Sequence, residues 1–253
     1  MIIYFSATGN CKHTAKVLAQ KTEDEAKSIL EFMNGREKAD FRDENRLGII
    51  APTYGWRLPS IVREFIQNTE ITVSENTYVY FVSTYGTSPG ATVHEMRRLL
   101  REKNIEIDSV YSIRMPDTWT PIFNLSDARK VEAINAAAES EIAQTAESIL
   151  AGDRRKRMKR QLPSFTLAIA AMVYDGMRRT ANLYVESNCT GCGLCERKCP
   201  VKAIEIKDGR PVWIKQQCTM CLGCLHRCPV FAIQYGRSRT KKHGQYINLH
   251  TKM

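Results

Sequence analysis

Long hydrophobic runs are missing from this sequence of 253 residues. The longest nearly apolar run, Phe165 to Tyr174, is much shorter than the roughly 18 to 20 residues that a membrane-spanning helix needs, so we expect no membrane span. The N-terminus also lacks the basic start and long apolar stretch of a secretory signal. These absences predict a cytoplasmic protein.

Acidic residues are scarce in the second part of the chain. Residues 151–253 hold 20 Lys and Arg but only 6 Asp and Glu, whereas residues 1–150 hold 17 and 21. The two parts therefore carry formal charges of +14 and −4, which predicts two modules. The overall composition, 43% hydrophobic and 25% charged, is typical of a folded globular protein and excludes a wholly disordered or collagen-like chain.

Cysteine is also scarce outside one region. Cys11 stands alone near the N-terminus, and the other eight cysteines lie between Cys189 and Cys228. Because the chain shows no export signal and cytosolic thiols are kept reduced, this clustering favours metal ligation over a disulfide framework.

Short apolar runs alternate with helical patterns in the first part of the chain. The predicted strands are residues 2–6, 27–32, 46–52, 77–83 and 105–114. The predicted helices are residues 10–21, 59–68, 90–103 and 127–151. This alternation predicts an α/β fold with a doubly wound, five-stranded parallel sheet in the order 2-1-3-4-5.

A basic run separates the two modules. Six of the seven residues from Arg154 to Arg160 are Lys or Arg. Such a run is usually a solvated linker, and contact with nucleic acid or an anionic membrane is the alternative. A helix over about residues 165–183 is expected to bridge to the cysteine-rich module.

The eight clustered cysteines form an internal repeat. The four cysteines from Cys189 to Cys199, together with Pro200, Val201, Ala203 and Ile204, recur 29 residues later, and each copy reads C-x2-C-x2-C-x3-C-P. Three thiolates at intervals of three residues can hold one face of a four-iron cluster, while the fourth is directed toward the other cluster. We therefore expect two interleaved ligand sets, namely Cys189, Cys192, Cys195 and Cys228, and Cys218, Cys221, Cys224 and Cys199.

Zinc is the alternative metal, because paired CxxC motifs also bind zinc. Zinc sites, however, need neither the third cysteine nor the following proline of each copy. On this motif, residues 184–236 resemble bacterial-type two-cluster [4Fe-4S] ferredoxins. The resemblance implies a small α+β domain that holds two [4Fe-4S] clusters and transfers single electrons at low potential. Asp208 and Gly209 are expected to form a tight turn between its halves.

A polar loop follows the first predicted strand. Ser6, Thr8 and Asn10 offer short polar side chains, Gly9 permits a tight backbone, and a helix begins near Asn10. The N-terminus of a helix presents free N–H groups to an anion, so the loop could hold a phosphate. A plain strand-to-helix turn is the alternative. Neither a Walker loop nor GxGxxG is present, which argues against ATP and dinucleotides.

Two more loops are expected to meet the first at the carboxyl edge of the sheet, where doubly wound folds bind ligands. They follow the third and fourth predicted strands, and their aromatic residues could sandwich a flat ring. Residues 1–150 resemble flavodoxins, with the TGN loop matching the FMN-phosphate motif, and the resemblance implies noncovalently bound FMN. The candidate FMN-binding residues are Ser6, Thr8, Gly9, Asn10, Cys11, Pro52, Thr53, Tyr54, Gly55, Trp56, Ser83, Thr84, Tyr85 and Gly86.

Cys11 departs from the flavodoxin pattern, in which Thr or Ser is common at this place. Its thiol is a poorer hydrogen-bond donor to phosphate, so the backbone must contribute more. A buried filler and a redox residue are both open interpretations of Cys11. Either Trp56 or Tyr85 is the candidate for the ring that stacks on the flavin.

The sequence thus predicts four segments: an FMN domain at 1–152, a basic linker and bridging helix at 153–183, a two-cluster domain at 184–236, and an extended or mobile basic tail at 237–253. The whole resembles flavodoxin–ferredoxin fusion proteins of anaerobes. The resemblance implies an electron-transfer protein that links a low-potential donor, two clusters and FMN to a redox partner protein.

One other function stays open at this stage. An FMN-dependent reductase would act directly on a small-molecule electron acceptor, and its catalytic residues cannot be placed from the sequence. We do not expect nucleic acid as a partner, and a homodimer stays an open possibility.

Overall fold

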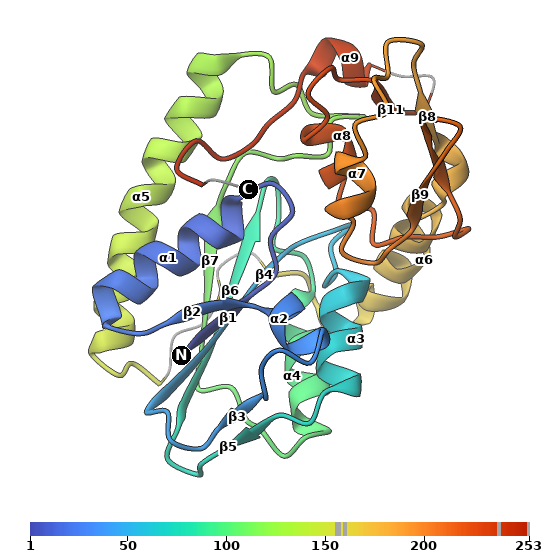
Figure 1. The fold of residues 1–253 in the computed structure, drawn as a ribbon. Helices are drawn as coiled ribbons and strands as arrows, with labels where there is room; N and C mark the ends of the chain where they lie inside the picture. The colour runs from blue at the N-terminus through green and yellow to red at the C-terminus, as the bar shows by residue number, and fades with distance from the viewer. Residues whose placement is uncertain (155–157, 159–160, 237–238, 252–253) are drawn as a thin grey trace.

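The computed structural model describes residues 1–154, 158, 161–236 and 239–251 (Figure 1). Most of the predicted basic run, at 155–157 and 159–160, therefore lies outside the described residues. The chain forms a large α/β domain and a smaller part with short strands and helices, which lies beyond one end of the large sheet (Figure 1).

Five parallel strands form the central sheet of the large domain, in the order β2-β1-β4-β6-β7. Counted along the chain, this is the predicted order 2-1-3-4-5, so the predicted fold class is confirmed. The sheet strands are β1 (Ile2–Tyr4), β2 (Ala26–Ser28), β4 (Arg46–Pro52), β6 (Tyr78–Tyr85) and β7 (Ser109–Arg114). Two short strands, β3 (Asp40–Phe41) and β5 (Thr72–Val73), pair with each other outside this sheet.

Helices cover both faces of the sheet. Two of them, α1 (Asn10–Thr22) and α5 (Ala128–Leu150), contact each other and cover one face. The other face is covered by α2 (Ile29–Met33), α3 (Ser60–Asn68) and α4 (Thr92–Arg101). Asp127 starts the long helix α5, because its carboxylate accepts a hydrogen bond from the N–H of Lys130.

The second strand is shorter than the predicted range of 27–32. It ends at Ser28, whose hydroxyl accepts a hydrogen bond from the N–H of Leu30. The N–H of Ser28 donates to the carboxylate of Glu31 at 2.9 Å. This reciprocal capping box begins α2 and so turns Ile29–Met33 from predicted strand into helix.

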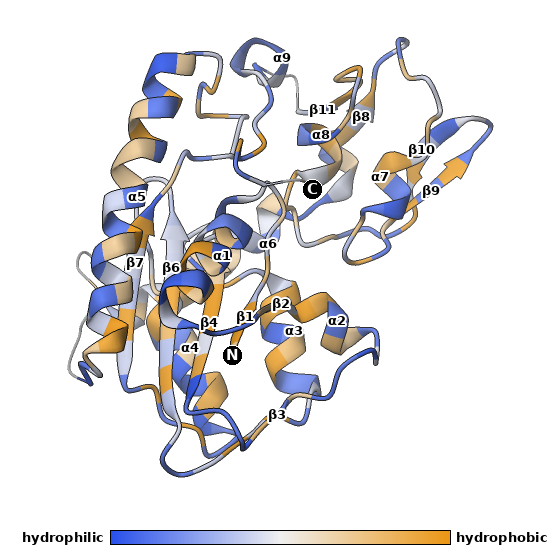
Figure 2. Cartoon of the chain, turned by 60° about the vertical axis from the view of Figure 1, so that its left-hand side comes forward, coloured by the Kyte–Doolittle hydropathy of each residue, from blue (hydrophilic) through white to orange (hydrophobic). Residues whose placement is uncertain are grey.

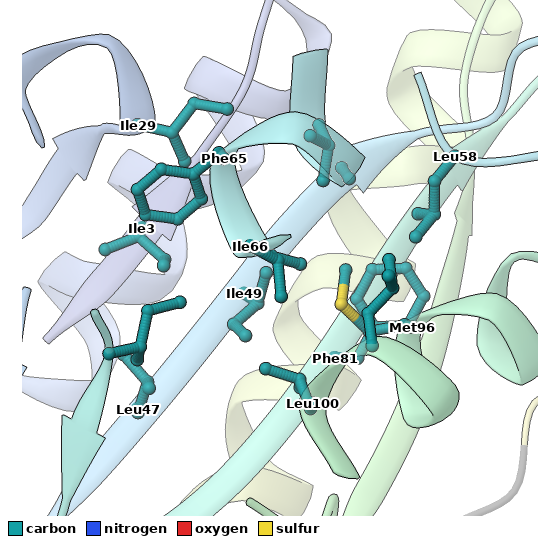
Figure 3. Close-up of a cluster of buried hydrophobic side chains, with 14 of the residues drawn as sticks. Ile3, Ile29, Leu47, Ile49, Leu58, Phe65, Ile66, Phe81, Met96 and Leu100 are labelled. Carbon is teal, nitrogen blue, oxygen red and sulfur yellow. The ribbon is translucent and has the colours of Figure 1, made fainter. Parts of the chain in front are cut away.

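Apolar side chains fill the space between the sheet and α3 and α4. Phe65, Ile66, Met96 and Leu100 are fully buried against strand residues such as Phe81 (Figure 3). Burial of each large side chain contributes about 1.5 to 3 kcal/mol. Figure 2 shows hydrophobic residues on the inner strands and many hydrophilic ones on the outer turns of α5, as a doubly wound domain requires.

The smaller part is built from paired short elements. Helix α6 (Leu167–Met177) lies between the two parts, and the predicted bridging helix ends earlier than residue 183 because residues 180–185 form a 3₁₀ turn and a strand. The remaining elements are η1 (Ser164–Thr166), η2 (Thr180–Asn182), β8 (Leu183–Val185), α7 (Leu194–Arg197), β9 (Ile204–Lys207), β10 (Arg210–Trp213), α8 (Gly223–His226), β11 (Ile233–Tyr235) and α9 (Thr240–His243).

Two antiparallel pairs hold this part together, β8 with β11 and β9 with β10. The predicted turn between β9 and β10 is confirmed, since Asp208 and Gly209 both have the positive φ angles of a type I′ hairpin. Among the helices of the described residues, none is both long and apolar enough to cross a membrane.

Candidate functional site

A cleft of about 230 Å³ opens at the carboxyl ends of β1, β4 and β6, next to the switch point between β1 and β4. The three predicted loops meet there. All candidate residues except Gly9 and Ser83 line the cleft, namely Ser6, Thr8, Asn10, Cys11, Pro52, Thr53, Tyr54, Gly55, Trp56, Thr84, Tyr85 and Gly86.

The two other candidates support the cleft from behind. The hydroxyl of Ser83 is fully buried and lies 2.9 Å from the hydroxyl of Thr53, whose orientation it holds. Gly9 has a φ of 100°, and a side chain there would collide with Asn248 and Thr251. Glycine is therefore required at position 9 both for its backbone and for the close approach of the C-terminal tail.

The first loop offers backbone donors where α1 begins. The N–H groups of residues 8–11 donate no hydrogen bond to any other described residue. The side chain of Asn10, in contrast, is already used. Its Oδ1 lies 2.8 Å from the hydroxyl of Tyr246 and 3.3 Å from Nδ2 of Asn248, while its own Nδ2 donates to the carbonyl of Pro116. An anion at this loop would therefore meet backbone groups before the Asn10 amide.

The C-terminal tail crosses this loop, as Figure 1 shows near the N-terminal end of α1. The N–H of Asn248 donates to the carbonyl of Thr8 at 2.8 Å, and Tyr246 is 6% exposed. Burial raises the pKa of Tyr246 to about 12, so its hydroxyl stays protonated. The sequence suggested an extended or mobile tail because residues 237–253 are basic and contain no acid. Buried hydrogen bonds, which composition does not reveal, hold its described part in place.

Cys11 lies at the bottom of the cleft and is 1% exposed. Its Sγ is 3.1 Å from the hydroxyl of Thr84, and burial raises the pKa of the thiol to about 12. A neutral, hydrogen-bonded thiol is a poor nucleophile. This environment supports the interpretation of Cys11 as a buried filler.

The cleft has walls that the sequence did not predict. The loop after β7 contributes residues 115–119, 122 and 123, α6 contributes Val173 and Met177, and the second cysteine repeat contributes residues 220–222. The sequence could have indicated the first of these walls, because the loop after β7 leaves the same edge of the sheet as the predicted loops. The other two depend on how the smaller part docks, which has no local sequence signal.

Asp117 is the only Asp, Glu, His, Lys or Arg among the described residues that line the cleft. Its carboxylate lies against Gly86, where any side chain would collide with it, and accepts a hydrogen bond from the N–H of Trp119 at 3.1 Å. Burial raises the pKa of this carboxyl to about 6, and the Trp119 hydrogen bond opposes the shift.

The cysteines of the smaller part surround two separate cavities. The members of each set are those that the repeat predicts: Cys189, Cys192, Cys195 and Cys228 line one cavity. Cys199, Cys218, Cys221 and Cys224 line the other. Among the described residues no three His, Cys, Asp or Glu side chains converge closely enough to hold a single metal ion.

Backbone N–H groups donate to the sulfur atoms in both copies of the repeat. The N–H of Ala203 lies 3.2 Å from Sγ of Cys199, and the N–H of Ala232 lies 3.2 Å from Sγ of Cys228. Hydrogen bonds of this kind favour the thiolate and help to set the potential of a bound cluster.

One wall is common to the cleft and to a cysteine cavity. Cys221 lines both, and its neighbours Met220 and Leu222 are each 3% exposed and also line the cleft. Both neighbours have positive φ, of 51° and 52°. Their counterparts in the first copy are Gly191 and Gly193, which adopt this backbone without cost. Strain of about 1 to 2 kcal/mol per residue is thus tolerated where side chains are needed at the cleft.

Three side chains join the two parts. The buried hydroxyl of Tyr174 in α6 donates to the carbonyl of Thr219 at 2.7 Å and accepts from the N–H of Ser60 at 3.0 Å. The guanidinium of Arg178 donates to the carbonyl of Cys218, and that of Arg227 donates to the carbonyl of Ala7. The cysteine cavity is therefore held against the cleft by buried contacts.

The imidazole of His226 in α8 adds a further link. It is 3% exposed, and burial lowers its pKa to about 4, so it is neutral at pH 7. Nδ1 accepts from the N–H of Tyr246 at 3.1 Å, which leaves Nε2 to donate to the carbonyl of Thr118 at 2.9 Å. One residue of the second repeat thus contacts both the tail and the loop after β7.

Comparisons with known proteins divide the chain into the same two parts, the large domain and the smaller part. A family model described as a flavodoxin domain matches residues 1–144, and one described as a 4Fe-4S dicluster domain matches residues 188–233. The chain therefore belongs to the flavodoxin domain family. It is a fusion of that domain with an iron–sulfur domain, which implies FMN and iron–sulfur clusters as cofactors and electron transfer as the type of function.

Solved structures with a similar fold are distant in sequence. A flavodoxin from the domain Archaea is 13% identical, with 58% of this chain and 96% of that chain covered and a TM-score of 0.33. A Streptococcus pneumonia flavodoxin is 19% identical, with 57% and 97% covered and a TM-score of 0.36. Rubredoxin oxygen:oxidoreductase from Desulfovibrio gigas is 14% identical, with 59% and 36% covered and a TM-score of 0.34. No curated protein matches the chain.

Proposed function

We propose that this chain carries electrons between two [4Fe-4S] clusters in its smaller part and FMN in the cleft of its flavodoxin domain. The position of Cys221 carries the proposal, because this residue lines both the cleft and a four-cysteine cavity. A shared wall places the two sites side by side.

The residues present fit these groups. Free N–H groups at residues 8–11 suit the FMN phosphate, and Trp56, Tyr85 and Trp119 give the cleft aromatic walls for a flat ring. The two four-cysteine cavities suit two clusters. When bound, FMN exchanges two electrons and releases them singly, whereas each cluster carries one.

The two cysteine sites have different places in this scheme. The site that contains Cys221 shares a wall with the cleft, and burial raises the pKa of the Cys221 and Cys224 thiols. Cys192 of the other site is exposed, and its cavity shares no residue with the cleft. We propose that an outside electron donor meets the Cys192 site and that the Cys221 site faces the flavin.

Residues of the chain keep this route closed to water. Met220 and Leu222 cover the cleft beside Cys221, and Tyr174 fixes α6 against both parts of the chain. We further propose segments at 1–152, 153–183, 184–236 and 237–253. A cytoplasmic place in an anaerobic cell suits cysteine-bound clusters, which need reduced thiols.

The decisive experiment is anaerobic reconstitution followed by analysis of iron, sulfide and flavin. We expect about eight iron atoms and one FMN per chain, and a low-potential reductant should bleach both the cluster and the flavin absorption. Zinc in place of iron, or a protein without flavin, would contradict the proposal.

Reduction of a small molecule at the flavin is a second candidate function. It is favoured by Asp117, a half-buried carboxyl in the cleft that could serve as a proton donor. A reductase would reduce a small acceptor catalytically without any second protein, whereas a carrier would need a protein acceptor. Turnover assays with and without a partner flavoprotein or ferredoxin separate the two.

A further inference from the structure

Among the described residues that line the cleft, one side chain is acidic, and contacts with its neighbours hold it in place. Asp117 follows β7 and comes from a loop whose neighbouring positions also line the cleft. Its carboxylate contacts Gly86 of the facing loop and accepts the N–H of Trp119. A carboxylate with no cation beside it in a partly enclosed cleft costs free energy, and such groups are often functional.

Few titratable groups face this carboxyl. They are Tyr85 at the end of β6 and Arg114 at the end of β7, whose guanidinium donates to the carbonyl of Gly86 in the facing loop. From α8, the neutral His226 contacts the carbonyl of Thr118. Those that line the rest of the cleft are Cys11, Tyr54 and Cys221. Among the described residues no cation pairs with Asp117, and only burial and the Trp119 hydrogen bond move its pKa to about 6.

We infer that Asp117 is the proton-accepting residue of the cleft, which binds a proton from solvent when an electron is delivered there. The inference rests on the proposed function, since it requires a flavin in the cleft. The first electron that is delivered adds one negative charge. The carboxylate takes up one proton, an O–H bond forms, and the neutral acid offsets that charge. The electrons come from the iron–sulfur sites, and no other bond changes.

This role sets the sign of a pH effect. Below about pH 6 Asp117 is already neutral in the oxidised protein, and above it the carboxylate disfavours added negative charge. The flavin potential should therefore fall more steeply with pH above about pH 6 than a protein without this carboxyl would show. Asp117→Asn keeps the acceptor for the Trp119 N–H and removes the charge.

The test is a spectroelectrochemical titration of the flavin from pH 5 to pH 8.5 in the full, reconstituted protein. Relative to wild type, Asp117→Asn should shift the flavin potential to a more positive value above pH 6. This offset should shrink toward zero below pH 6. An offset that is absent, or that does not change with pH, would overturn the inference. Asp175→Asn, which removes an exposed carboxylate on α6, is the matched control and should show no such pH dependence.

A second measurement keeps the inference testable if the variant does not fold or hold flavin. Infrared difference spectra of wild type at pH 7 should gain the C=O band of a protonated carboxyl on reduction, and the band should shift in a protein labelled with ¹³C-aspartate. Absence of the band would overturn the inference. A wild-type chain that holds no flavin would overturn the proposed function as well, so the two failures are distinguishable.

Discussion

The two copies of the cysteine repeat share one backbone but have different surroundings. In the first copy Gly191 and Gly193 occupy the left-handed positions, and in the second copy Met220 and Leu222 occupy them with similar φ angles. Cys192 is exposed, whereas its counterpart Cys221 lies in the wall of the cleft. The glycines adopt this backbone without strain. Met220 and Leu222 adopt it with strain, and their side chains cover the cleft.

This difference shows which side chains of the second copy contact the large domain. A ferredoxin repeat needs only its cysteines and its turns, and the first copy shows that minimum. The second copy adds apolar cover at Met220 and Leu222, and it adds polar contacts through His226 and Arg227. Departures from the repeat therefore mark the interface with the cleft.

Removal of equivalent ligands from the two copies should have the largest effect. Cys189→Ser and Cys218→Ser should each lower the iron content from about eight to about four atoms per chain, because each cluster needs all of its thiolates. Only Cys218→Ser removes charge next to the cleft, so only it should shift the flavin potential. Iron analysis and flavin redox titration measure both effects. Equal shifts in the two variants would contradict the assignment of near and far sites.

A second test makes the two copies alike at one position. Leu222→Gly relieves a left-handed backbone but loses a buried side chain, with a net cost of about 2 kcal/mol in the free energy of unfolding. It should also weaken FMN binding, because Leu222 lines the cleft. The matched control, Gly193→Leu, introduces left-handed strain and a close contact with Arg197 outside the cleft lining, and it should leave FMN affinity unchanged. Urea unfolding and FMN titration check the pair, and equal losses of FMN affinity would argue against a special role for the second copy.

Features that depend on residues close together in the sequence could be predicted from it. The parallel sheet, the polar loop before α1 and both cysteine sets follow from periodicity, turn residues and ligand spacing, which act over a few residues. The sequence was insufficient where contacts join distant segments. The hydrogen bond from Asn248 to Thr8 and the cleft wall of Met177 depend on docking of two domains, and no local pattern encodes that.

Asn10 lines the cleft, but its side-chain amide is already hydrogen-bonded within the chain. The partners of the amide are Tyr246 and Asn248 of the tail. A short polar side chain in a phosphate loop is compatible with either use. Only the tertiary contact decides which atoms remain available to a ligand.

The carboxyl of Asp117, which lines the cleft, should make the stability of the protein depend on pH. The folded-state pKa of Asp117 is raised from 3.8 to about 6, so its contribution is fully present below pH 3.8 and is lost as pH rises through 6. Asp117→Asn should therefore stabilise the flavin-free protein, by ~1 kcal/mol more at pH 8 than at pH 5. Urea unfolding at the two pH values measures this difference. A gain that is the same at both would show that Asp117 is not buried in the flavin-free cleft.

The smallest expected effect concerns Arg227, whose counterpart in the first copy is Lys198. The Arg227 guanidinium donates to the carbonyl of Ala7 in the polar loop and lies 3.4 Å from the carbonyl of Lys198. Lysine offers a single point of donation instead of a fork, so Arg227→Lys should cost about 1 kcal/mol and weaken FMN binding about fivefold. Lys198→Arg, the reciprocal change, should leave FMN affinity as it is. If both variants bind FMN like wild type, the Arg227 contact does not order the loop, and the backbone donors of residues 8–11 hold their geometry without help from the second copy.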